Sequence, residues 1–243
     1  MNIKLNIQYD GTNYHGWQIQ PKQVSVQSTL LRAVAEVTSQ RVNIIGCGRT
    51  DARVHAIDYV CNFDVETTIP VERLPHAINA HLPNDIICKS AELVSDDFRA
   101  NQSAKKKTYL YKVLNTEHPD AFLRNYSWHY KYPLDLYKMQ EAAKAFLGEH
   151  DFIGFASAGF SVKTTVRTIY SLDVRQNGDI FEIEVCGNGF LYNMVRIIVG
   201  TLVYMGNDKI DYRTCKDIID SCDRTRAGIT APPQGLFLKE VFY

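Results

Sequence analysis

Two long runs of alternating residues, 166–175 and 179–185, are separated by only Gln176, Asn177 and Gly178. An Asn-Gly pair between alternating runs is typical of a tight β-hairpin, so the two runs are predicted to pair antiparallel. Further strands are predicted at residues 3–9, 86–90, 108–113 and 235–243. Strands and helices alternate irregularly around this direct hairpin, which predicts an α+β fold on a mainly antiparallel sheet.

Helical periodicity fills the segments between these strands. It predicts a helix that begins after Ser25 and further helices at residues 71–81, 135–148, 189–205 and 211–222. Ser25 is placed to cap the first helix, which is expected to cover one face of the sheet. Pro75 shortens or delays the second helix, and Gly148 is expected to end the third.

Length and charge limit the class of protein. A chain of 243 residues fits one large domain or two halves that share a cleft. We divide it into an N-terminal half, 1–104, with the Asp51 loop, and a C-terminal half, 105–243. Twenty-seven basic residues balance 27 acidic ones, so any RNA-binding surface must be local. The start lacks the apolar core of a signal peptide and no long apolar span follows, which predicts a cytoplasmic protein outside the membrane.

The six cysteines are scattered without a close ligand pair such as C-x-x-C. This spacing predicts reduced thiols. Cys47 lies near Asp51, but no neighbouring pattern marks it as a nucleophile. We therefore interpret Cys47 as a small apolar packing residue.

Residues 46–56 interrupt two strand-like runs with glycines, small polar groups and opposed charges. Because both ends lead into strands, the segment is predicted to be a loop held at both ends. Asp51 is its only acid, with Arg49 two residues before it and Arg53 two residues after it. The arginines favour the ionised carboxylate, which suits an anionic nucleophile or base. The alternative interpretation is a surface turn with local ion pairs.

A loop rich in aromatic and amide side chains, residues 9–21, precedes the first helix. Aromatic faces stack on bases and amides read polar edges, which favours a loop that contacts nucleotides. A tight turn whose rings pack on the core is an equally good interpretation.

Basic residues are concentrated between residues 99 and 112, where no acid occurs. Three of them are consecutive: Lys105, Lys106 and Lys107. Tyr109 and Tyr111 follow at strand spacing, so their rings share one face. Phosphate contacts beside a stacking ring are what single-stranded or flipped-out RNA requires. The alternative is a solvated charge run before an ordinary tyrosine-rich strand.

Arg196 is the only charged residue in the predicted helix 189–205. A lone guanidinium in a buried helix needs an acidic or phosphate partner, because an unpaired buried charge is costly. Asp51 is the obvious candidate. The alternative is an arginine whose stem lies along the surface while its head reaches water.

Three spaced motifs occur in order along the chain: Tyr9-Asp10-Gly11 through Gly16-Trp17-Gln18-x-Gln20, Gly48-Arg49-Thr50-Asp51-Ala52-x-Val54-His55-Ala56, and Asn188-Gly189-Phe190-Leu191-Tyr192-x-Met194-Val195-Arg196. Supporting stretches include Val199-Gly200 and Gly228-x-Thr230-Ala231-Pro232-x-x-Gly235-Leu236-x-Leu238. With these motifs the chain resembles the TruA family of tRNA pseudouridine synthases over nearly its full length.

The resemblance implies two RRM-like α/β halves with a joined, mainly antiparallel sheet and a central active-site cleft. It also implies a homodimer, tRNA as the substrate, isomerisation of uridine at positions 38 to 40 of the anticodon stem-loop, and no metal or organic cofactor. By correspondence with the family motifs, Asp51 is the nucleophile and Arg49 helps to displace the target base. Tyr109 lies against the uracil ring, and Arg196 pairs with the catalytic carboxylate.

The implied reaction moves uracil from an N1 bond to a C5 bond on C1′, so it needs no redox step or external group. Asp51 attack on C1′, its addition to C6 and its withdrawal of the 2′ proton remain open. The nucleotide has to leave its stack, at a cost of about a few kcal/mol. Lys105, Lys106 and Lys107 are expected to offset part of that cost by holding the flanking phosphates.

Arg53 departs from the family pattern, which usually has glycine at this position. Either the loop differs locally, or the glycine is not needed for its φ angle. A strand pattern would return Arg53 to the face of Asp51, where it is expected to reach an RNA phosphate. The alternative is that Arg53 folds back onto a surface acid.

Two other classes of protein compete with this interpretation. A non-catalytic RNA-binding protein needs only the basic stretch and the aromatic rings. A metal-dependent hydrolase would use Asp51 and His55, which share a face only if their loop is helical. The alternating residues around the loop favour a strand, and no second cluster of acids and histidines completes a metal shell.

Overall fold

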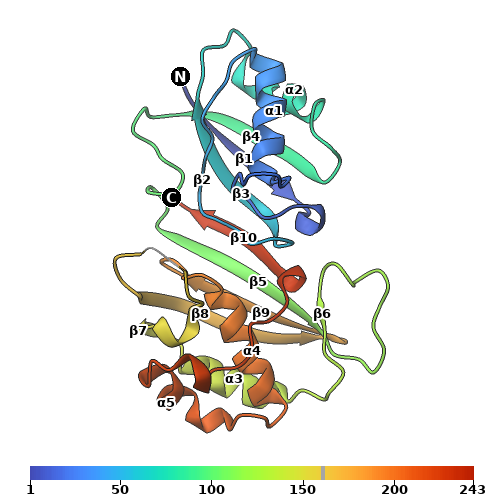
Figure 1. Cartoon of the computed structure of the whole chain (residues 1–243), viewed down its shortest axis with the longest axis vertical. Helices are drawn as coiled ribbons and strands as arrows, with labels where there is room; N and C mark the ends of the chain where they lie inside the picture. The colour runs from blue at the N-terminus through green and yellow to red at the C-terminus, as the bar shows by residue number, and fades with distance from the viewer. Residues whose placement is uncertain (160–161) are drawn as a thin grey trace. The chain divides into compact units, whose positions relative to one another are not determined.

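The computed structural model describes residues 1–159 and 162–243. The chain forms two compact units: Met1–Lys105 with Phe237–Tyr243, and Lys106–Leu236 (Figure 1). The last strand therefore groups with the N-terminal unit. Each unit combines helices with a mainly antiparallel sheet, which confirms the predicted α+β class. The joining of the two sheets and the central cleft stay predictions.

The first unit has its strands in the order β4-β1-β3-β10, with β2 also paired to β3. These strands are β1 (Asn2–Tyr9), β2 (Ile45–Gly46), β3 (His55–Asp64), β4 (Ile86–Val94) and β10 (Leu236–Phe242). Only the pairing of β10 with β3 is parallel in this unit. The helices are α1 (Val26–Thr38) and α2 (Leu74–Asn79), and the 3-10 turns are η1 (Gly11–Asn13) and η2 (Val71–Arg73).

Local sequence explains these elements. Ile3, Leu5 and Ile7 alternate along β1 and are fully buried, so this strand contributes every second residue to the core. The hydroxyl of Ser25 accepts a hydrogen bond from the backbone of Ser28, which confirms the predicted cap of α1. Pro75 occupies the first turn of α2, a position where its missing N–H has no helical partner to lose.

The second unit has its strands in the order β5-β9-β8-β7, with β6 paired parallel to β5. These strands are β5 (Lys106–Leu114), β6 (Trp128–His129), β7 (Gly148–Asp151), β8 (Val166–Asn177) and β9 (Ile180–Gly187). The helices are α3 (Leu136–Lys144), α4 (Met194–Gly206) and α5 (Cys215–Asp220). The 3-10 turns are η3 (Ile153–Phe155), η4 (Tyr212–Thr214), η5 (Arg224–Arg226) and η6 (Pro233–Gly235).

The predicted hairpin is confirmed, since Asn177 faces Ile180 in an antiparallel register and Gly178 has a φ of 58°. Several helix boundaries were predicted wrongly. The third predicted helix ends at Lys144, because Gly148, with a φ of 94°, already begins β7. The helix predicted from residue 189 begins at Met194, after a left-handed residue, and the last helix is shorter than predicted.

Close backbone packing explains two glycines of the supporting motifs. A Cβ on Gly200, in α4, would lie 1.9 Å from the carbonyl oxygen of Ile229. A Cβ on Gly228 would lie 2.6 Å from the backbone of Gly200, and the N–H of Gly228 donates to the hydroxyl of Thr201 at 2.8 Å. Residues 228–231 can therefore run directly along α4 only because these positions lack side chains.

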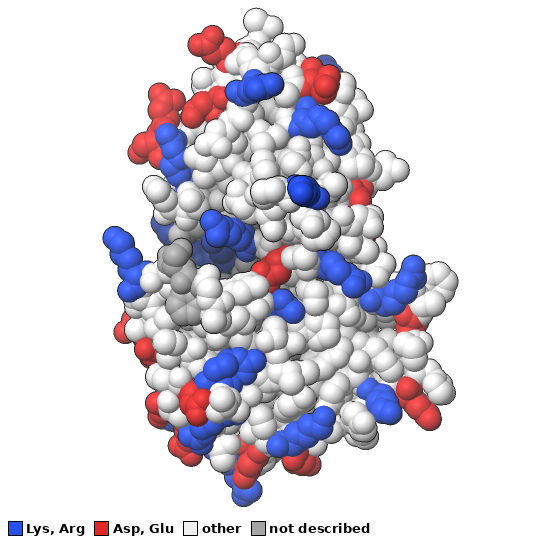
Figure 2. Space-filling view, viewed as in Figure 1, with Lys and Arg blue, Asp and Glu red and all other residues white. Residues whose placement is uncertain are grey.

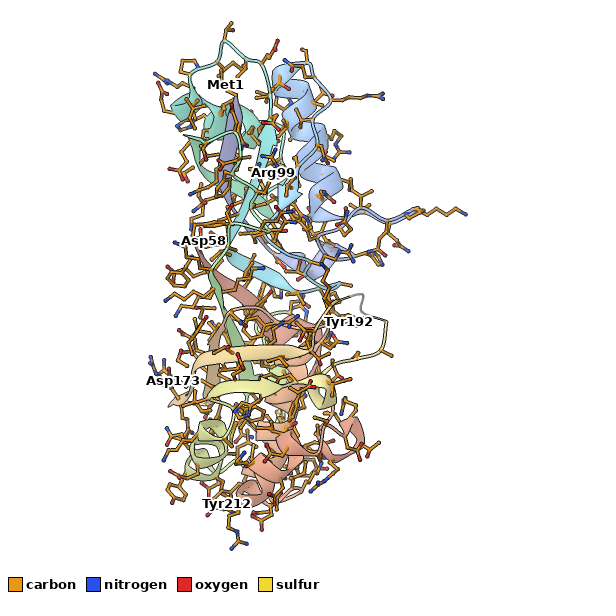
Figure 3. The ribbon with its side chains drawn as sticks, turned by 90° about the vertical axis from the view of Figure 1, so that its left-hand side faces the viewer. Met1, Asp58, Arg99, Asp173, Tyr192 and Tyr212 are labelled. Carbon is orange, nitrogen blue, oxygen red and sulfur yellow. The ribbon has the colours of Figure 1, made fainter. Side chains whose placement is uncertain are left out.

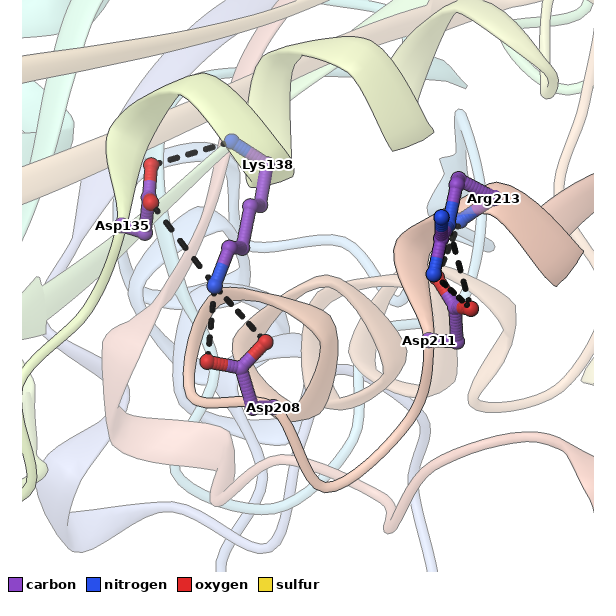
Figure 4. Close-up of polar contacts among 5 residues, drawn as sticks. All are labelled: Asp135, Lys138, Asp208, Asp211 and Arg213. Atoms are coloured by element: carbon purple, nitrogen blue, oxygen red, sulfur yellow. Dashed lines mark hydrogen bonds and ion pairs between the residues drawn. The ribbon is translucent and has the colours of Figure 1, made fainter.

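Ion pairs occur where α3 begins and α4 ends (Figure 4). Lys138 lies 2.7 Å from both carboxylate oxygens of Asp208, and Arg213 binds both oxygens of Asp211. These pairs are exposed and contribute little to stability. Apolar contact holds α3 and α4 together more closely than these ion pairs do. A Cβ on Gly206, in α4, would lie only 2.7 Å from the Met139 side chain of α3.

On the face shown in Figure 2, basic side chains are interspersed with acidic ones, in keeping with the zero net charge. All six cysteines are free, and every one except Cys222 is buried. Burial raises the pKa of the Cys88 and Cys215 thiols to about 12, so both stay protonated. Within the described residues, no helix has the length and apolar character needed to cross a membrane.

Candidate active site

The loop between β2 and β3 carries Arg49, Asp51 and Arg53. It is held at both ends, as predicted. At its start, the hydroxyl of Tyr59 donates to the carbonyl of Gly48 at 2.5 Å. Burial raises the pKa of Tyr59 well above its ordinary value, so this hydroxyl remains a donor. At the other end, the N–H of Val54 donates to the carbonyl of Asp51 at 3.2 Å. The backbone of Asp51 is therefore confined between two fixed points.

The aromatic loop of residues 9–21 packs against the Asp51 loop. The rings of Tyr9, Tyr14 and Trp17 are buried. The hydroxyl of Tyr9 lies 2.8 Å from that of Thr50, and the N–H of Trp17 donates to the carbonyl of Thr50 at 3.1 Å. For these three rings the core-packing interpretation is right, because each is almost fully buried.

Two glycines allow the two loops to touch. Gly16 has a φ of 79°, and a Cβ there would lie 2.3 Å from the carbonyl oxygen of Thr50. A Cβ on Gly11 would lie 2.0 Å from the carbonyl oxygen of Val54. Any larger residue at either position has to displace the backbone next to Asp51. The first and second sequence motifs are thus two sides of one packing contact.

Arg53 has a φ of 65°, in the left-handed region that favours glycine. Arginine thus occupies a backbone conformation that favours glycine, the residue that the family usually has at this position. Residues 52 and 53 form a turn rather than a strand, so the expectation that Arg53 returns to the face of Asp51 by strand alternation is wrong. The N–H of Arg53 donates to the carbonyl of Tyr14 at 3.1 Å, and this bond helps to hold the turn.

Arg49 is exposed and borders a cavity of about 300 Å³. Four residues with side-chain amides also line this cavity: Gln18, Gln27, Asn43 and Asn101. Buried Gln27 connects two segments beside the cavity. Its amide nitrogen donates to the carbonyl of Ile44, and its amide oxygen accepts from the N–H of Ile19. The guanidinium of Arg49 and the neighbouring amides provide hydrogen-bond donors and acceptors. A polynucleotide offers partners for both.

His55 has a structural explanation. It is buried at the start of β3, its Nδ1 accepts a hydrogen bond from the N–H of Gly11 at 3.0 Å, and its ring stacks on Phe237. The loop before it is not helical, so the geometry required for a shared Asp51–His55 metal face is absent. In the described part of the chain, no group of three acid, histidine or cysteine side chains is placed to hold a metal ion.

The basic stretch spans the boundary between the units. Lys105 ends the first unit, where its N–H donates to the carbonyl of Phe242, and Lys106 and Lys107 begin β5. Tyr109, also on β5, is half-buried and its ring meets the edge of Phe190 at a centroid distance of 5.1 Å. Phe190 belongs to the segment that leads into α4.

Arg196 lies in the first turn of α4 and is the only charged residue of that helix. Its Nε donates to the carbonyl of Ala231 at 2.7 Å, and its Nη1 donates to the Oδ1 of Asn193 at 2.7 Å. The sequence patterns single out Arg196 but not Asn193, although an asparagine just before a helix is a recognisable signal.

The structure thus brings Arg49, Asp51 and Arg53 together in the first unit. Lys106, Lys107, Tyr109 and Arg196 belong to the second. The pairing of Asp51 with Arg196 therefore stays a prediction.

The chain thus combines a mainly antiparallel α+β scaffold with a loop that carries one carboxylate, Asp51, between two arginines. The family model for tRNA pseudouridine synthase matches residues 6–101 and 142–243. The chain belongs to this family, which confirms the resemblance to the TruA synthases, and it is therefore an isomerase that forms pseudouridine in tRNA.

Three relatives illustrate the similarity. The tRNA pseudouridine synthase A of Thermoanaerobacter sp. (strain X514) is 50% identical over 242 residues, which cover 100% of this chain and 99% of that protein. The synthase A of Acetivibrio thermocellus and the synthase A 2 of Clostridium perfringens (strain 13 / Type A) are each 48% identical with the same coverage. A solved structure of a Cbf5-Nop10-Gar1 complex aligns over 82% of this chain and 53% of the matched chain, at 12% sequence identity. Its TM-score of 0.35 is too low to carry a conclusion.

Proposed function

We propose that this chain isomerises uridine at positions 38 to 40 of the tRNA anticodon stem-loop, with Asp51 as the nucleophile. The observation that carries the proposal is the loop of Asp51, whose backbone is fixed by β3 on one side and by buried Tyr9, Tyr14 and Trp17 on the other. Fixed placement matters because a nucleophile gains most of its rate advantage from alignment with the reacting atom.

The other groups serve the extruded nucleotide. Arg49 helps to displace the target base, and its exposed position beside the amide-lined cavity supports contact with RNA outside the reacting uridine. Tyr109 packs against the uracil ring, and Arg196 is the charge partner of Asp51. Lys105, Lys106 and Lys107 hold flanking phosphates. No metal or organic cofactor takes part, and the enzyme acts as a cytoplasmic homodimer.

Incubation with an unmodified tRNA transcript in the presence of a metal chelator, followed by chemical mapping of pseudouridine, tests this proposal. We expect pseudouridine at positions 38 to 40 only where those positions carry uridine. Modification confined to another region of the tRNA would contradict the proposed target. Binding without any modification would support the non-catalytic RNA-binding protein instead, and loss of activity on chelation would contradict a metal-free reaction.

Replacing Arg53 by glycine is expected to raise the free energy of unfolding by about 0.5–1 kcal/mol. Relief of the left-handed conformation is worth about 1–2 kcal/mol, and the greater freedom of glycine in the unfolded chain offsets part of it.

We further propose that Arg53 contacts an RNA phosphate. In Arg53→Gly the plot of log affinity against log salt should therefore flatten by about one unit. Single-turnover isomerisation at saturating enzyme is expected to stay unchanged.

Lys22 provides a matched control, since it is exposed and also left-handed, with a φ of 62°. Lys22→Gly should bring the same gain in stability while the salt dependence of tRNA binding stays as in the parent. An unchanged salt slope in Arg53→Gly would contradict the phosphate contact. Faster chemistry in that variant would show that Arg53 strains the catalytic loop.

A further inference from the structure

Asn193 begins α4 in an unusual way. Asparagine at this position normally has an extended backbone, and its side chain caps the helix by accepting a hydrogen bond from a first-turn N–H. Here Asn193 is left-handed, with a φ of 61° and a ψ of 4°, and its side chain makes no capping bond. The turn before it contains Tyr192, which Figure 3 labels. The Asn193 side chain therefore serves some purpose other than starting the helix.

That side chain connects two other residues. Its Oδ1 accepts from Arg196 Nη1 at 2.7 Å, and its Nδ2 donates to the hydroxyl oxygen of Ser157 at 2.8 Å. A guanidinium only donates hydrogen bonds, so the amide has to present its oxygen to Arg196. Turning the amide over would place two donors face to face. The Ser157 hydroxyl accepts from the amide nitrogen in this orientation, and this second bond holds the amide beside Arg196.

Ser157 is itself fixed, because its N–H donates to the carbonyl of Tyr192 at 3.1 Å. Arg196 has a second anchor in Ala231, which is fully buried. Its Nε donates to the Ala231 carbonyl at 2.7 Å, and its backbone carbonyl accepts from the N–H of Ala231 at 3.0 Å. Bonds at Nε and Nη1 restrain both the position of the guanidinium and the rotation of its plane. Without them, a long side chain would have to be ordered by its partner alone.

We propose that Asn193 is a positioning residue for Arg196 and that Ser157 holds the amide of Asn193 in place. The inference rests on the role proposed above for Arg196 as the charge partner of Asp51. Asn193 acts through Arg196 and touches no reacting atom. It should therefore affect the rate of isomerisation rather than the binding of tRNA.

Asn193→Gly separates this role from the backbone requirement, because glycine adopts the left-handed conformation without strain. We expect the single-turnover rate at saturating enzyme to fall by about 10- to 100-fold, the range that misplacement of a catalytic group produces. The dissociation constant for tRNA should stay within about twofold, and Tm within about 3 °C of the parent. A near-parental rate in Asn193→Gly would overturn the proposal.

The part played by Ser157 is tested in two backgrounds. In the parent, Ser157→Ala should lower the rate by about fivefold, because the amide of Asn193 loses the second bond that holds it beside Arg196. In Asn193→Gly, the same change should lower it by less than about twofold, because the side chain that Ser157 holds is already gone. Asn193→Asp should retain more activity than Asn193→Gly, because a carboxylate still presents an oxygen to Arg196. An equal effect of Ser157→Ala in both backgrounds would overturn the role of Ser157 in holding the amide.

Arg196→Met distinguishes failure of this inference from failure of the proposed function. If Arg196→Met is slow and Asn193→Gly is not, Arg196 keeps its role and only the positioning by Asn193 is wrong. If Arg196→Met reacts at the parental rate, the role of Arg196 is wrong and the inference falls with it. If both single variants are slow, adding Asn193→Gly to Arg196→Met should cause no further loss of rate, because the group that Asn193 positions is already gone.

Discussion

Replacing Asp51 by asparagine is expected to lower the single-turnover rate of pseudouridine formation by about 10⁴-fold or more. The amide has nearly the shape of the carboxylate but lacks the anionic oxygen that a nucleophile or base needs. Formation of the C5–C1′ bond releases the proton of C5, so release of tritium from tRNA labelled at uracil C5 measures the rate directly. Asp51→Ala should lose activity to the same extent.

Binding of tRNA to Asp51→Asn should remain within about threefold of the parent, since phosphate contacts supply most of the affinity. The loop is expected to keep its conformation because backbone groups hold it, among them the carbonyl of Thr50 and the N–H of Val54. Asp64, exposed at the end of β3, is a suitable control, and Asp64→Asn should leave the rate unchanged. Turnover by Asp51→Asn within about tenfold of the parent would mean that another group attacks the nucleotide.

Replacing Arg196 by methionine is expected to lower the rate by about 10²- to 10³-fold, as loss of one preorganised electrostatic partner usually does. The free energy of unfolding should fall by about 1–3 kcal/mol, because the carbonyl of buried Ala231 loses its charged donor. Single-turnover assays and urea unfolding measure the two effects separately. Arg196→Lys should lie between the parent and Arg196→Met, since an ammonium keeps the charge but not the planar fork.

Arg213 provides the control for Arg196→Met. It is an exposed arginine that binds both oxygens of Asp211 within the same unit (Figure 4). Arg213→Met should change neither the rate nor the unfolding transition, because an exposed ion pair contributes little to stability. A rate for Arg196→Met close to that of Arg213→Met would show that Arg196 does not take part in the reaction.

The sequence carried most of the information about local structure. Alternation of apolar residues predicted the strands, the Asn-Gly pair predicted the β8–β9 hairpin, and Ser25 predicted the start of α1. These features depend on neighbours within a few residues, so a local pattern is enough to recognise them. Helix ends were less well predicted, and α4 begins five residues later than expected because Asn193 adopts a conformation that no periodicity indicates.

The family motifs are short and ordered along the chain, and for this reason the sequence alone also determined the class of enzyme and named Asp51, Arg49, Tyr109 and Arg196 as candidates. It left two interpretations of the aromatic loop open, and only the tertiary structure decided between them. Tyr9, Tyr14 and Trp17 are buried because their loop packs against the Asp51 loop. This contact joins residues about forty positions apart in the sequence.

The tertiary structure also decided the backbone conformations of Arg53 and Asn193. Both have left-handed backbones, and both make hydrogen bonds to distant segments: the N–H of Arg53 donates to the carbonyl of Tyr14, and the Nδ2 of Asn193 donates to the hydroxyl of Ser157. Such strain persists only where the surrounding structure over-determines it. A sequence specifies residue types and their spacing, but the partners that hold a strained residue are set by the folded chain.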